Sequence, residues 1–422
     1  MSNLQSSKYM KDIVVVGGGP SGSFTALNLA KMGAKVTVFE EHEKIGLPSH
    51  CAGHISIRSL KNLGLYPLPE SILENTFSQA NFFSPKGFKF SIQLRKPVTC
   101  SLNRAAFDKL IAEKAKAAGA SYHLKSRVQS LIVKNNIVKG VTVKQSGGTE
   151  KSVPAKIVVD AEGISSRLLR QAGLSPFNRS SLVYAVEAEV EGVKDMEPSA
   201  VDVYMGKTFA LGFYAWLIPR LDGTAKVGLA TKSGNPKESL TWLMSKHPAA
   251  TKKLGRAKIT QTAFHSISLG GTISKAFSSG FIAVGDAASQ IKPTTGGGVI
   301  LGLTCSRIAA QIIHEALEKN DVSSDFLQLY QQRCSEALGF DLKVMLRIRH
   351  FLDSLSDEKV DRVLRFCAKF GLSETLENVD EIDFQGQTIL KLLTKPSAFV
   401  ALTYFMLLYL SVNPKGSGEA NW

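Results

Sequence analysis

Residues 12–53 read DIVVVGGGPSGSFTALNLAKMGAKVTVFEEHEKIGLPSHCAG, and this stretch decides the fold. Residues 13–16 are a short β-branched apolar run that ends at glycine, which is typical of a buried parallel strand. Glycines after such a strand let the backbone approach a pyrophosphate, whose charge the free N–H groups of a helix N-terminus stabilise. The residues of this predicted turn are Gly17, Gly18, Gly19, Pro20, Ser21 and Gly22.

The rest of the stretch completes a dinucleotide-binding unit. Residues 26–32 continue the helix, and residues 36–39 read as a second strand. Glu40 closes that strand, where a carboxylate accepts hydrogen bonds from a ribose 2′-hydroxyl and repels a phosphorylated ribose. A glycine-rich turn without a ligand is the alternative interpretation, and it becomes weaker with each further block described below.

Length and charge limit the class of protein. A chain of 422 residues is expected to form two or three domains around a large core. The net charge of +15 and the pI of about 9.5 favour an anionic partner, which is nucleic acid, membrane or substrate. Basic residues are not grouped in a block interleaved with aromatics, so nucleic acid is the least favoured partner. Scattered lysines that only keep the surface soluble are the alternative.

Cysteine spacing and the N-terminus indicate the compartment. The five cysteines are odd in number and show no CxxC, zinc or iron–sulfur spacing, so we expect a reduced chain without a bound metal. They are Cys51, Cys100, Cys305, Cys334 and Cys367. The N-terminus, MSNLQSSKYMKD, lacks the apolar core of a secretory signal. We therefore predict a cytoplasmic location.

The segment 397–412, SAFVALTYFMLLYLSV, is the most apolar part of the chain. It lies between Pro396 and Pro414 and is shorter than the ~20 residues that a spanning helix needs. A core helix is one interpretation. The other is a helix that lies peripherally on the inner face of the cell membrane, with lysines near its ends: Lys391, Lys395 and Lys415.

The region after the opening stretch contains a hairpin and a helix. Residues 80–94 alternate around a Pro-Lys-Gly turn, which predicts a β-hairpin. Residues 101–119 have helical spacing, with Asn103 as N-cap and Gly119 as stop. Arg104 lies in the first turn of this helix. It is either a solvated charge or a phosphate contact beside the dinucleotide.

A second turn and a β-rich region follow. Residues 156–160 form a strand that leads into AEGISSRLLRQAG at 161–173, a further strand-turn-helix at which a cofactor could lie. Residues 182–232 contain short alternating runs, which predict a sheet above a substrate cavity. Aromatic side chains line that cavity or pack in the core: Phe82, Phe83, Phe209, Phe213, Tyr214 and Trp216.

The third block is FIAVGDAASQIKPTTGGGVILGL at 281–303. A buried strand ends in Gly285 and Asp286, and an aspartate at a strand's carboxyl end can hold a ribityl hydroxyl. Three glycines, 296–298, then open a helix whose N-terminus favours the negative charge that a reduced flavin carries near N1 and O2. Lys292 adds to this effect if it points inward.

At these separations the blocks resemble the p-hydroxybenzoate-hydroxylase-like class of FAD proteins, over residues 12 to about 320. Within that class, PSHCAG at 48–53 looks like the PxxCxG motif of the geranylgeranyl reductase family. FYAWLIP at 213–219 looks like the YxWxxP segment of the same family. Members of the family saturate isoprenoid double bonds in archaeal digeranylgeranylglycerophospholipids or in the prenyl chain of chlorophyll precursors.

The resemblance implies a role for each matching residue. Glu40 would lie on the adenosine side, Val128 would meet the adenine through its backbone, and Cys51 would lie beside the isoalloxazine and act in catalysis. Tyr214 and Trp216 would bind substrate. The implied FAD contacts are Gly17, Gly19, Pro20, Ser21, Gly22, Glu40, Cys51, Ala52, Gly53, Arg104, Val128, Asp286, Gly296, Gly297, Gly298 and Val299.

Two positions depart from the pattern of the class. Glu162 stands where the class usually has aspartate. Ala230 replaces the second glycine expected after Gly228, which puts the local shape of the substrate sheet in doubt.

The expected fold is α/β, with a Rossmann-type FAD-binding domain, an inserted antiparallel β-sheet domain for substrate, and a C-terminal helical region. The FAD-binding domain is predicted to be discontinuous and to comprise residues 1–75, 98–175 and 270–324. The β-rich substrate domain comprises 76–97 and 176–269, and the helical region comprises 325–422. The oligomeric state is not predicted.

The expected reaction is reduction of geranylgeranyl C=C bonds, by hydride from flavin N5 and a proton from the protein or water. The substrate would be a prenylated lipid with an anionic head group, and the electron donor NADPH or a reduced ferredoxin. Cys51 would donate the proton, relay it, or only shape the pocket. The alternatives are an FAD monooxygenase, a reduced-flavin isomerase resembling lycopene cyclase, and a flavin-dependent sensor or membrane adaptor. The cysteine motif argues against all three.

Overall fold

The computed structural model describes residues 11–145 and 147–412, so the N-terminal ten residues, Pro414 and Lys415 lie outside the described part of the chain. An eight-stranded sheet carries the nucleotide-binding turn. Its strands are β1 (Lys11–Val16), β2 (Val36–Phe39), β8 (Ser121–His123), β9 (Ser126–Lys134), β10 (Ile137–Gln145), β11 (Glu150–Asp160), β17 (Phe277–Ser278) and β18 (Phe281–Ala283).

The centre of this sheet is parallel. β18, β11, β1, β2 and β8 follow one another in that order, and β17 pairs antiparallel with β18 at one edge. β9 and β10 form an antiparallel extension beside β11. Parallel strands end at one edge of the sheet, so the turns after β1, β2, β11 and β18 meet there. This is the arrangement that the three sequence blocks predicted.

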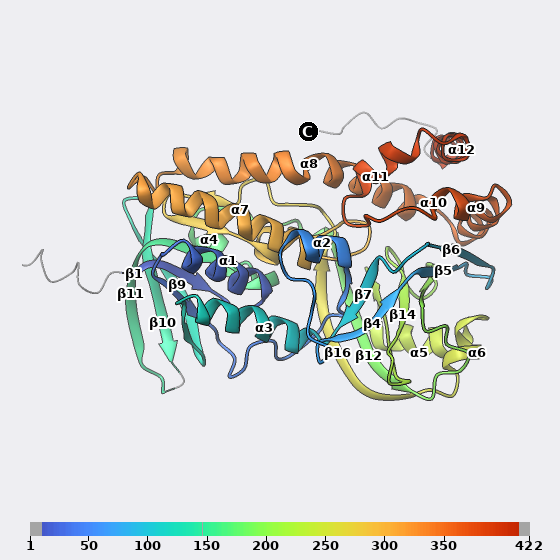
Figure 1. Ribbon diagram of the computed structural model, residues 1–422, viewed down its shortest axis with the longest axis horizontal. Coiled ribbons are helices and arrows are strands. Elements are labelled where there is room, and N and C mark those ends of the chain that lie inside the picture. Colours follow the sequence, from blue (N-terminus) through green and yellow to red (C-terminus); the bar gives the residue numbers. More distant parts are fainter. Residues whose placement is uncertain (1–10, 146, 413–422) are drawn as a thin grey trace, which may run out of the picture.

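Helices bury the sheet and set the direction of its turns. α1 (Pro20–Lys31) packs against α3 (Arg104–Ala117) and α7 (Val299–Glu318), as Figure 1 shows. Ile13, Val14 and Val15 of β1 are fully buried in one core with side chains of these helices and of β9 and β10. A continuous apolar strand is therefore required at β1.

A seven-stranded sheet forms the second layer. Its order is β16 (Lys258–Ser268), β12 (Leu182–Glu191), β15 (Ala225–Thr231), β14 (Ala215–Pro219), β13 (Ala200–Tyr204), β5 (Gln79–Phe83) and β6 (Lys89–Gln93). The predicted hairpin is confirmed as the β5–β6 pair. All neighbours are antiparallel except β13 and β5, which come from separate segments of the chain and pair parallel.

Smaller elements join the two sheets. We call the segment 48–53, PSHCAG, the cysteine turn. A three-stranded sheet follows it, made of β3 (His54–Ser56), β7 (Thr99–Leu102) and β4 (Leu73–Phe77). The remaining short elements are α2 (Ile57–Asn62), α4 (Arg167–Gln171), α5 (Pro236–Lys246), α6 (Ala250–Leu254) and 3-10 turns at Gly163–Ser165, Arg179–Ser181 and Gly285–Ala288. α5 and α6 pack on the outer face of the seven-stranded sheet, so its inner face is left for the site.

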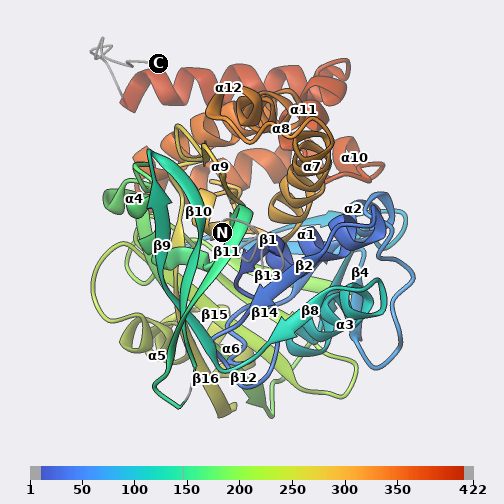
Figure 2. The ribbon, with the colours of Figure 1, turned by 90° about the vertical axis from the view of Figure 1, so that its left-hand side faces the viewer.

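The C-terminal region is helical, as predicted. It consists of α8 (Ser324–Ser354), α9 (Asp357–Lys369), α10 (Leu372–Leu376), α11 (Gln385–Leu392) and α12 (Pro396–Val412). Figures 1 and 2 show these helices along one side of the molecule, next to α7. α9 and α10 pack on β6, so the helical region covers the edge of the substrate sheet.

The grouping of strands supports the predicted domain division, which we retain as a proposal. The segments 76–97 and 176–269 supply every strand of the seven-stranded sheet. Within residues 11–145 and 147–412, no helix has the length and apolar character needed to cross a membrane.

Candidate active site

A cavity of about 480 Å³ lies where the turns of the first sheet face β16 of the second. Among the predicted site residues, it is lined by Gly17, Gly19, Pro20, Ser21, Glu40, Cys51, Arg104, Val128, Asp286, Gly296, Gly298 and Val299. The other predicted residues are not part of this lining: Gly22, Ala52, Gly53, Gly297, Tyr214 and Trp216. Sequence blocks more than 200 residues apart thus form one site.

Two glycines of the turn after β1, Gly17 and Gly22, have no room for a side chain. Gly17 has φ +98°, and a Cβ there would overlap the carbonyl of Ala161 in the turn after β11. A Cβ at Gly22 would overlap the carbonyl of Gly17. The N-cap of α1 is Gly19, which has no side chain, and among the described residues no side-chain cap bonds the first N–H groups of the helix. These N–H groups are therefore available to an anion.

Glu40 lies at the carboxyl end of β2 and is 8% exposed. Its carboxylate accepts hydrogen bonds from the backbone N–H groups of Gly18, at 2.7 Å, and His42, at 2.9 Å. These two bonds hold the acid at the cavity wall next to the glycine turn. The His42 ring Nδ1 also lies 2.6 Å from Glu40 Oε1. A carboxylate has about four lone-pair positions, so one position remains for a ribose hydroxyl.

Arg104 lies in the first turn of α3, whose predicted N-cap is confirmed because Asn103 accepts a hydrogen bond from Ala106 N–H. The Arg104 guanidinium donates to both oxygens of Asp108, at 3.0 and 3.2 Å. Burial alone would lower the pKa of Arg104, but the Asp108 carboxylate and the nearby Cys51 thiol raise it. The buried Nε has no hydrogen-bond partner among the described residues, so one donor remains for a ligand.

Two histidines that the sequence analysis did not single out lie beside Cys51. His50 precedes it, and His265 comes from β16; their rings stack with centroids 6.4 Å apart. Both rings line the cavity, and within the described residues the buried Nδ1 of His265 has no partner. Burial, with His50 and Arg104 nearby, lowers the pKa of His265 to about 4. Burial likewise lowers the pKa of His50, so both rings are neutral at pH 7.

The far wall is built by the turn after β18 and the triple glycine. Many protein atoms surround the Asp286 carboxyl group, and this desolvation raises its pKa. The side chain is nevertheless exposed, because it lines the cavity. A methyl group at Gly298 would lie 2.9 Å from Asp286 Oδ1. Gly298 caps α7 without a side-chain hydrogen bond from the described residues, so this N-terminus also faces the cavity.

Lys292 does not line the cavity, so the condition for its effect on the flavin site, that it points inward, is not met. The Lys292 ammonium forms an ion pair with the carboxylate of Asp383, which also accepts a hydrogen bond from Ser59 Oγ at 2.6 Å. Both charged side chains are buried. A buried ammonium requires a carboxylate partner, and the partner comes from the C-terminal region rather than from the cavity.

The turn after β11 explains one departure from the class pattern. The Glu162 carboxylate accepts a hydrogen bond from Leu168 N–H at 2.7 Å and lies 3.4 Å from Arg167, so it fixes the start of α4. Arg167 in turn donates to the carbonyl of Val128 at 3.2 Å. The longer glutamate therefore holds the turn whose Arg167 contacts Val128 in the cavity wall.

An aromatic wall lies on the inner face of the seven-stranded sheet. Phe213, Tyr214 and Trp216 pack in one cluster with Ala52, next to Cys51. Tyr214 donates a hydrogen bond to the carbonyl of Thr295 at 3.0 Å, just before the triple glycine. A Cβ at Gly228 would lie 2.5 Å from the Trp216 ring, so the glycine makes room for the indole.

The second departure is also accommodated. Ala230 is fully buried in the same cluster, where its methyl group packs against the aromatic wall. The substrate sheet keeps its antiparallel pairing on both sides of this residue. The doubt about the shape of the sheet is therefore resolved by the packing.

These features fit FAD. The uncapped N-terminus of α1 and the cation of Arg104 suit a pyrophosphate, and the N-terminus of α7 suits negative charge on a flavin ring. Glu40 and Asp286 present carboxylates at the cavity wall for hydroxyl groups. At Gly17 and Gly298 a side chain would collide with neighbouring protein atoms, and the glycines leave the backbone there open to a cofactor. Residues 10–338 match the family described as FAD binding domain. Fold and site thus define an FAD-dependent oxidoreductase.

Named relatives narrow the class. Digeranylgeranylglycerophospholipid reductase 2 of Methanothermobacter thermautotrophicus is 34% identical over 84% of this chain and 91% of that protein. The digeranylgeranylglycerophospholipid reductase of Methanocaldococcus jannaschii is 31% identical over 93% and 97% of the two chains. The chain belongs to the digeranylgeranylglycerophospholipid reductase family, which confirms the resemblance that PSHCAG indicated.

Solved structures agree with this assignment. A geranylgeranyl bacteriochlorophyll reductase-like protein of Thermoplasma acidophilum superposes with a TM-score of 0.83 at 28% identity, over 94% of this chain and all of that one. A flavin-dependent brominase superposes with a TM-score of 0.68 at 20% identity, over 96% of this chain and all of that one. The second likeness shows the shared fold alone.

Proposed function

We propose that this chain is an FAD-dependent reductase that saturates C=C bonds of geranylgeranyl chains in archaeal-type membrane phospholipid precursors. The observation that carries the proposal is the position of Cys51. Its side chain lines the cavity beside Arg104, while the next residue, Ala52, packs against the aromatic wall of the substrate sheet. The cysteine thus lies between the predicted flavin site and a surface suited to a prenyl chain. The names of the relatives supply the substrate class.

The predicted FAD residues keep their proposed roles. Glu40 holds the adenosine ribose, Arg104 with the start of α1 holds the pyrophosphate, and Asp286 holds the ribityl chain. Val128 contacts the adenine, and Gly298 with the start of α7 lies at the pyrimidine end of the ring. The remaining proposed contacts line the cavity or support its turns: Gly17, Gly19, Pro20, Ser21, Gly22, Cys51, Ala52, Gly53, Gly296, Gly297 and Val299.

The chain's own residues position the alkene and supply a proton. Bound and reduced FAD provides the hydride for one alkene carbon. Phe213, Tyr214 and Trp216 bind the prenyl chain and exclude water. The thiol of Cys51 gives its proton to the other alkene carbon, and the guanidinium of Arg104 stabilises the thiolate that remains.

A further part of the proposal concerns the membrane. Leu390 on α11 and Val400 on α12 are 54% and 43% exposed, and Lys391 is exposed between them in sequence. Such apolar side chains with nearby cations suit contact with an anionic bilayer. We therefore assign the exposed sides of α11 and α12 as the peripheral membrane contact.

The decisive experiment uses chemically reduced, FAD-loaded protein and an unsaturated digeranylgeranyl phospholipid, with mass spectrometry of the product. A gain of two hydrogen atoms for each reduced bond supports the proposal. A gain of oxygen would identify a monooxygenase, and an isomer of unchanged mass would identify an isomerase or cyclase. Repeating the reaction with NADPH or with reduced ferredoxin in place of the chemical reductant identifies the electron donor.

The membrane assignment is tested by co-sedimentation with vesicles that contain anionic lipid. Replacing both Leu390 and Val400 with glutamate should lower the partition coefficient roughly tenfold, because two apolar contacts are lost and two repelled charges are gained. Leu221→Glu is the matched control, since Leu221 is 73% exposed but lies in the turn between β14 and β15. Equal binding by the double variant and the wild type would refute the assignment.

A further inference from the structure

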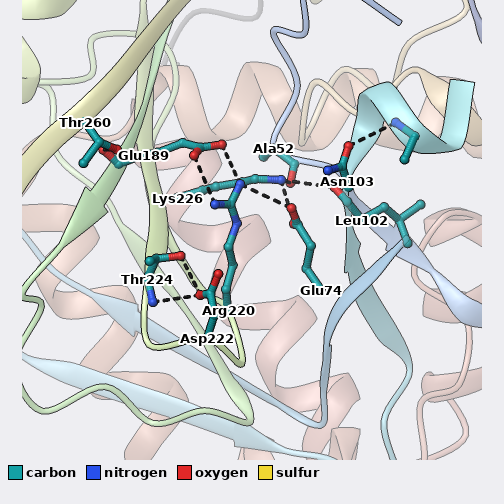
Figure 3. Close-up of polar contacts among 11 residues, drawn as sticks. Ala52, Glu74, Leu102, Asn103, Glu189, Arg220, Asp222, Thr224, Lys226 and Thr260 are labelled. Carbon is teal, nitrogen blue, oxygen red and sulfur yellow. Dashed lines mark hydrogen bonds and ion pairs between the residues drawn. The ribbon is translucent and has the colours of Figure 1, made fainter. Parts of the chain in front are cut away.

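A buried lysine of the substrate sheet reaches the cysteine turn. Lys226 on β15 is only 4% exposed. An ammonium group has three N–H donors. Each donor of Lys226 has an acceptor, as Figure 3 shows: the Ala52 carbonyl at 3.2 Å, Glu74 Oε2 at 2.7 Å and the Leu102 carbonyl at 3.1 Å. One side chain thus joins three separate segments of the chain.

The two carbonyls belong to the segments that carry site residues. Ala52 directly follows Cys51, and Leu102 lies two residues before Arg104. The segments are also joined to each other, because Leu102 N–H donates to the carbonyl of Gly53 at 3.0 Å. Lys226 therefore fixes the backbone at the point where both the thiol and the guanidinium turn toward the cavity.

The register of the sheet places this lysine on the same face as the aromatic wall. Lys226 pairs with Ile218 on β14, and Gly228, two residues further, pairs with Trp216. Residues i and i+2 of a strand point to the same face. β15 thus supports the indole with its glycine and the cysteine turn with its lysine.

Carboxylates compensate the buried charge. Arg220 lies 3.2 Å from Glu74 and donates to Glu189 at 2.5 Å, so Glu74 is held between two cations (Figure 3). Removing one member of such a buried group leaves another charge unpaired, which is strongly unfavourable. The network therefore resists movement of the Lys226 ammonium.

We propose that Lys226 is a positioning residue for alkene reduction. Its ammonium holds the carbonyls of Ala52 and Leu102, and it thereby keeps Cys51 Sγ and the Arg104 guanidinium in their positions at the cavity. Lys226 acts through these residues, since the described cavity lining does not include it. The catalytic consequence rests on the proposed function, whereas the positioning of the turn can be measured without any lipid.

The test is alkylation of Cys51 by iodoacetamide in the FAD-loaded, full-length protein, followed by mass spectrometry. In Lys226→Met the hydrogen bonds from the ammonium to the Ala52 and Leu102 carbonyls are lost, so Cys51 should be alkylated about tenfold faster. Cys334, which is also partly exposed, is the internal reference and should not change. With reduced, FAD-saturated enzyme and lipid, single-turnover reduction should fall about tenfold.

Lys253→Met is the matched control. Lys253 pairs with Asp202 at 2.6 Å in the same domain, and its loss also leaves a buried carboxylate unpaired, but neither residue contacts the cysteine turn. This variant should leave the alkylation of Cys51 unchanged. Lys226→Arg, which retains charge and donors, should restore most of the wild-type protection.

Three results would overturn the inference. The first is a wild-type alkylation rate for Cys51 in Lys226→Met. The second is an equal rise at Cys51 in both methionine variants, and the third is an equal rise at Cys334, because either indicates general loosening. If Lys226→Met does not fold, Glu74→Gln decides: it keeps the shape but weakens the hold on the ammonium, and unchanged alkylation there refutes the role. Failure of wild-type protein to reduce lipid would refute the proposed function and leave the alkylation result standing.

Discussion

Glu187 on β12 provides a sharp test of the electrostatics in the substrate sheet. Its side chain is 8% exposed, and Oε2 has no hydrogen-bond partner among the described residues. Burial raises the pKa of Glu187 to about 7, although the Lys226 ammonium and the indole N–H of Trp216 partly oppose this rise. The indole lies close enough to affect the pKa without forming a well-aligned hydrogen bond. We expect Glu187→Gln to change how stability depends on pH.

The sign follows from the two pKa values. The folded protein binds the proton of Glu187 more tightly, with a pKa of about 7 against 4.5 for the unfolded chain. The stabilisation is therefore complete below pH 4.5 and is lost as the pH rises through 7. One pKa unit corresponds to about 1.4 kcal/mol, so the loss between pH 5 and pH 8 is about 2 to 3 kcal/mol. Glutamine is neutral at both pH values and lacks this loss.

The assay is urea unfolding of the FAD-loaded proteins at pH 5 and pH 8. Relative to wild type, Glu187→Gln should gain about 2 to 3 kcal/mol of unfolding free energy on going from pH 5 to pH 8. Glu189→Gln is the control, because the hydrogen bond from Arg220 lowers the pKa of Glu189 and no gain at pH 8 should follow. An identical pH dependence of wild type and Glu187→Gln would refute the reasoning.

Two further predictions concern the cavity. Gly17→Ala should weaken FAD binding at least about tenfold, because the methyl group combines positive-φ strain with overlap of the Ala161 carbonyl. Gly33→Ala is the control: Gly33 has φ +84° but open space around it, so this variant should bind FAD normally. Fluorescence titration with FAD would measure the affinity of each variant. Equal FAD affinities of Gly17→Ala and the wild type would contradict the proposed contact between the glycine turn and FAD. Cys51→Ser should retain the yellow cofactor but lose about a hundredfold in single-turnover alkene reduction if the thiol is the proton donor, and full activity would leave Cys51 with a passive role.

Local signals in the sequence predicted the cofactor domain well. The apolar strand, the glycine turn and the acid after β2 are spaced along one short segment, so the pattern of residues specifies their geometry directly. The Asn103 cap and the β5–β6 hairpin are local for the same reason, and the structure confirms both. PSHCAG was sufficient to indicate the family, because a motif requires no knowledge of what packs against it.

Contacts across the sheets could not be predicted in this way. His265 lies on an alternating strand that carries no motif, and it meets His50 only because β16 faces the cysteine turn. From its neighbours in sequence, Lys292 could have pointed toward the flavin site. Asp383 in the C-terminal region pairs with it instead, and nothing near Lys292 in the sequence indicates that partner.

The sequence by itself therefore determined the fold class, the FAD-binding turns and the family, since each of these depends on short-range spacing. Only the tertiary structure decided what surrounds Cys51: Arg104 from α3, His265 from β16, and Lys226 from β15 behind the turn. The physical reason is that buried charges and unpaired donors must find partners wherever strand pairing places them, and that placement depends on register and packing across the whole chain.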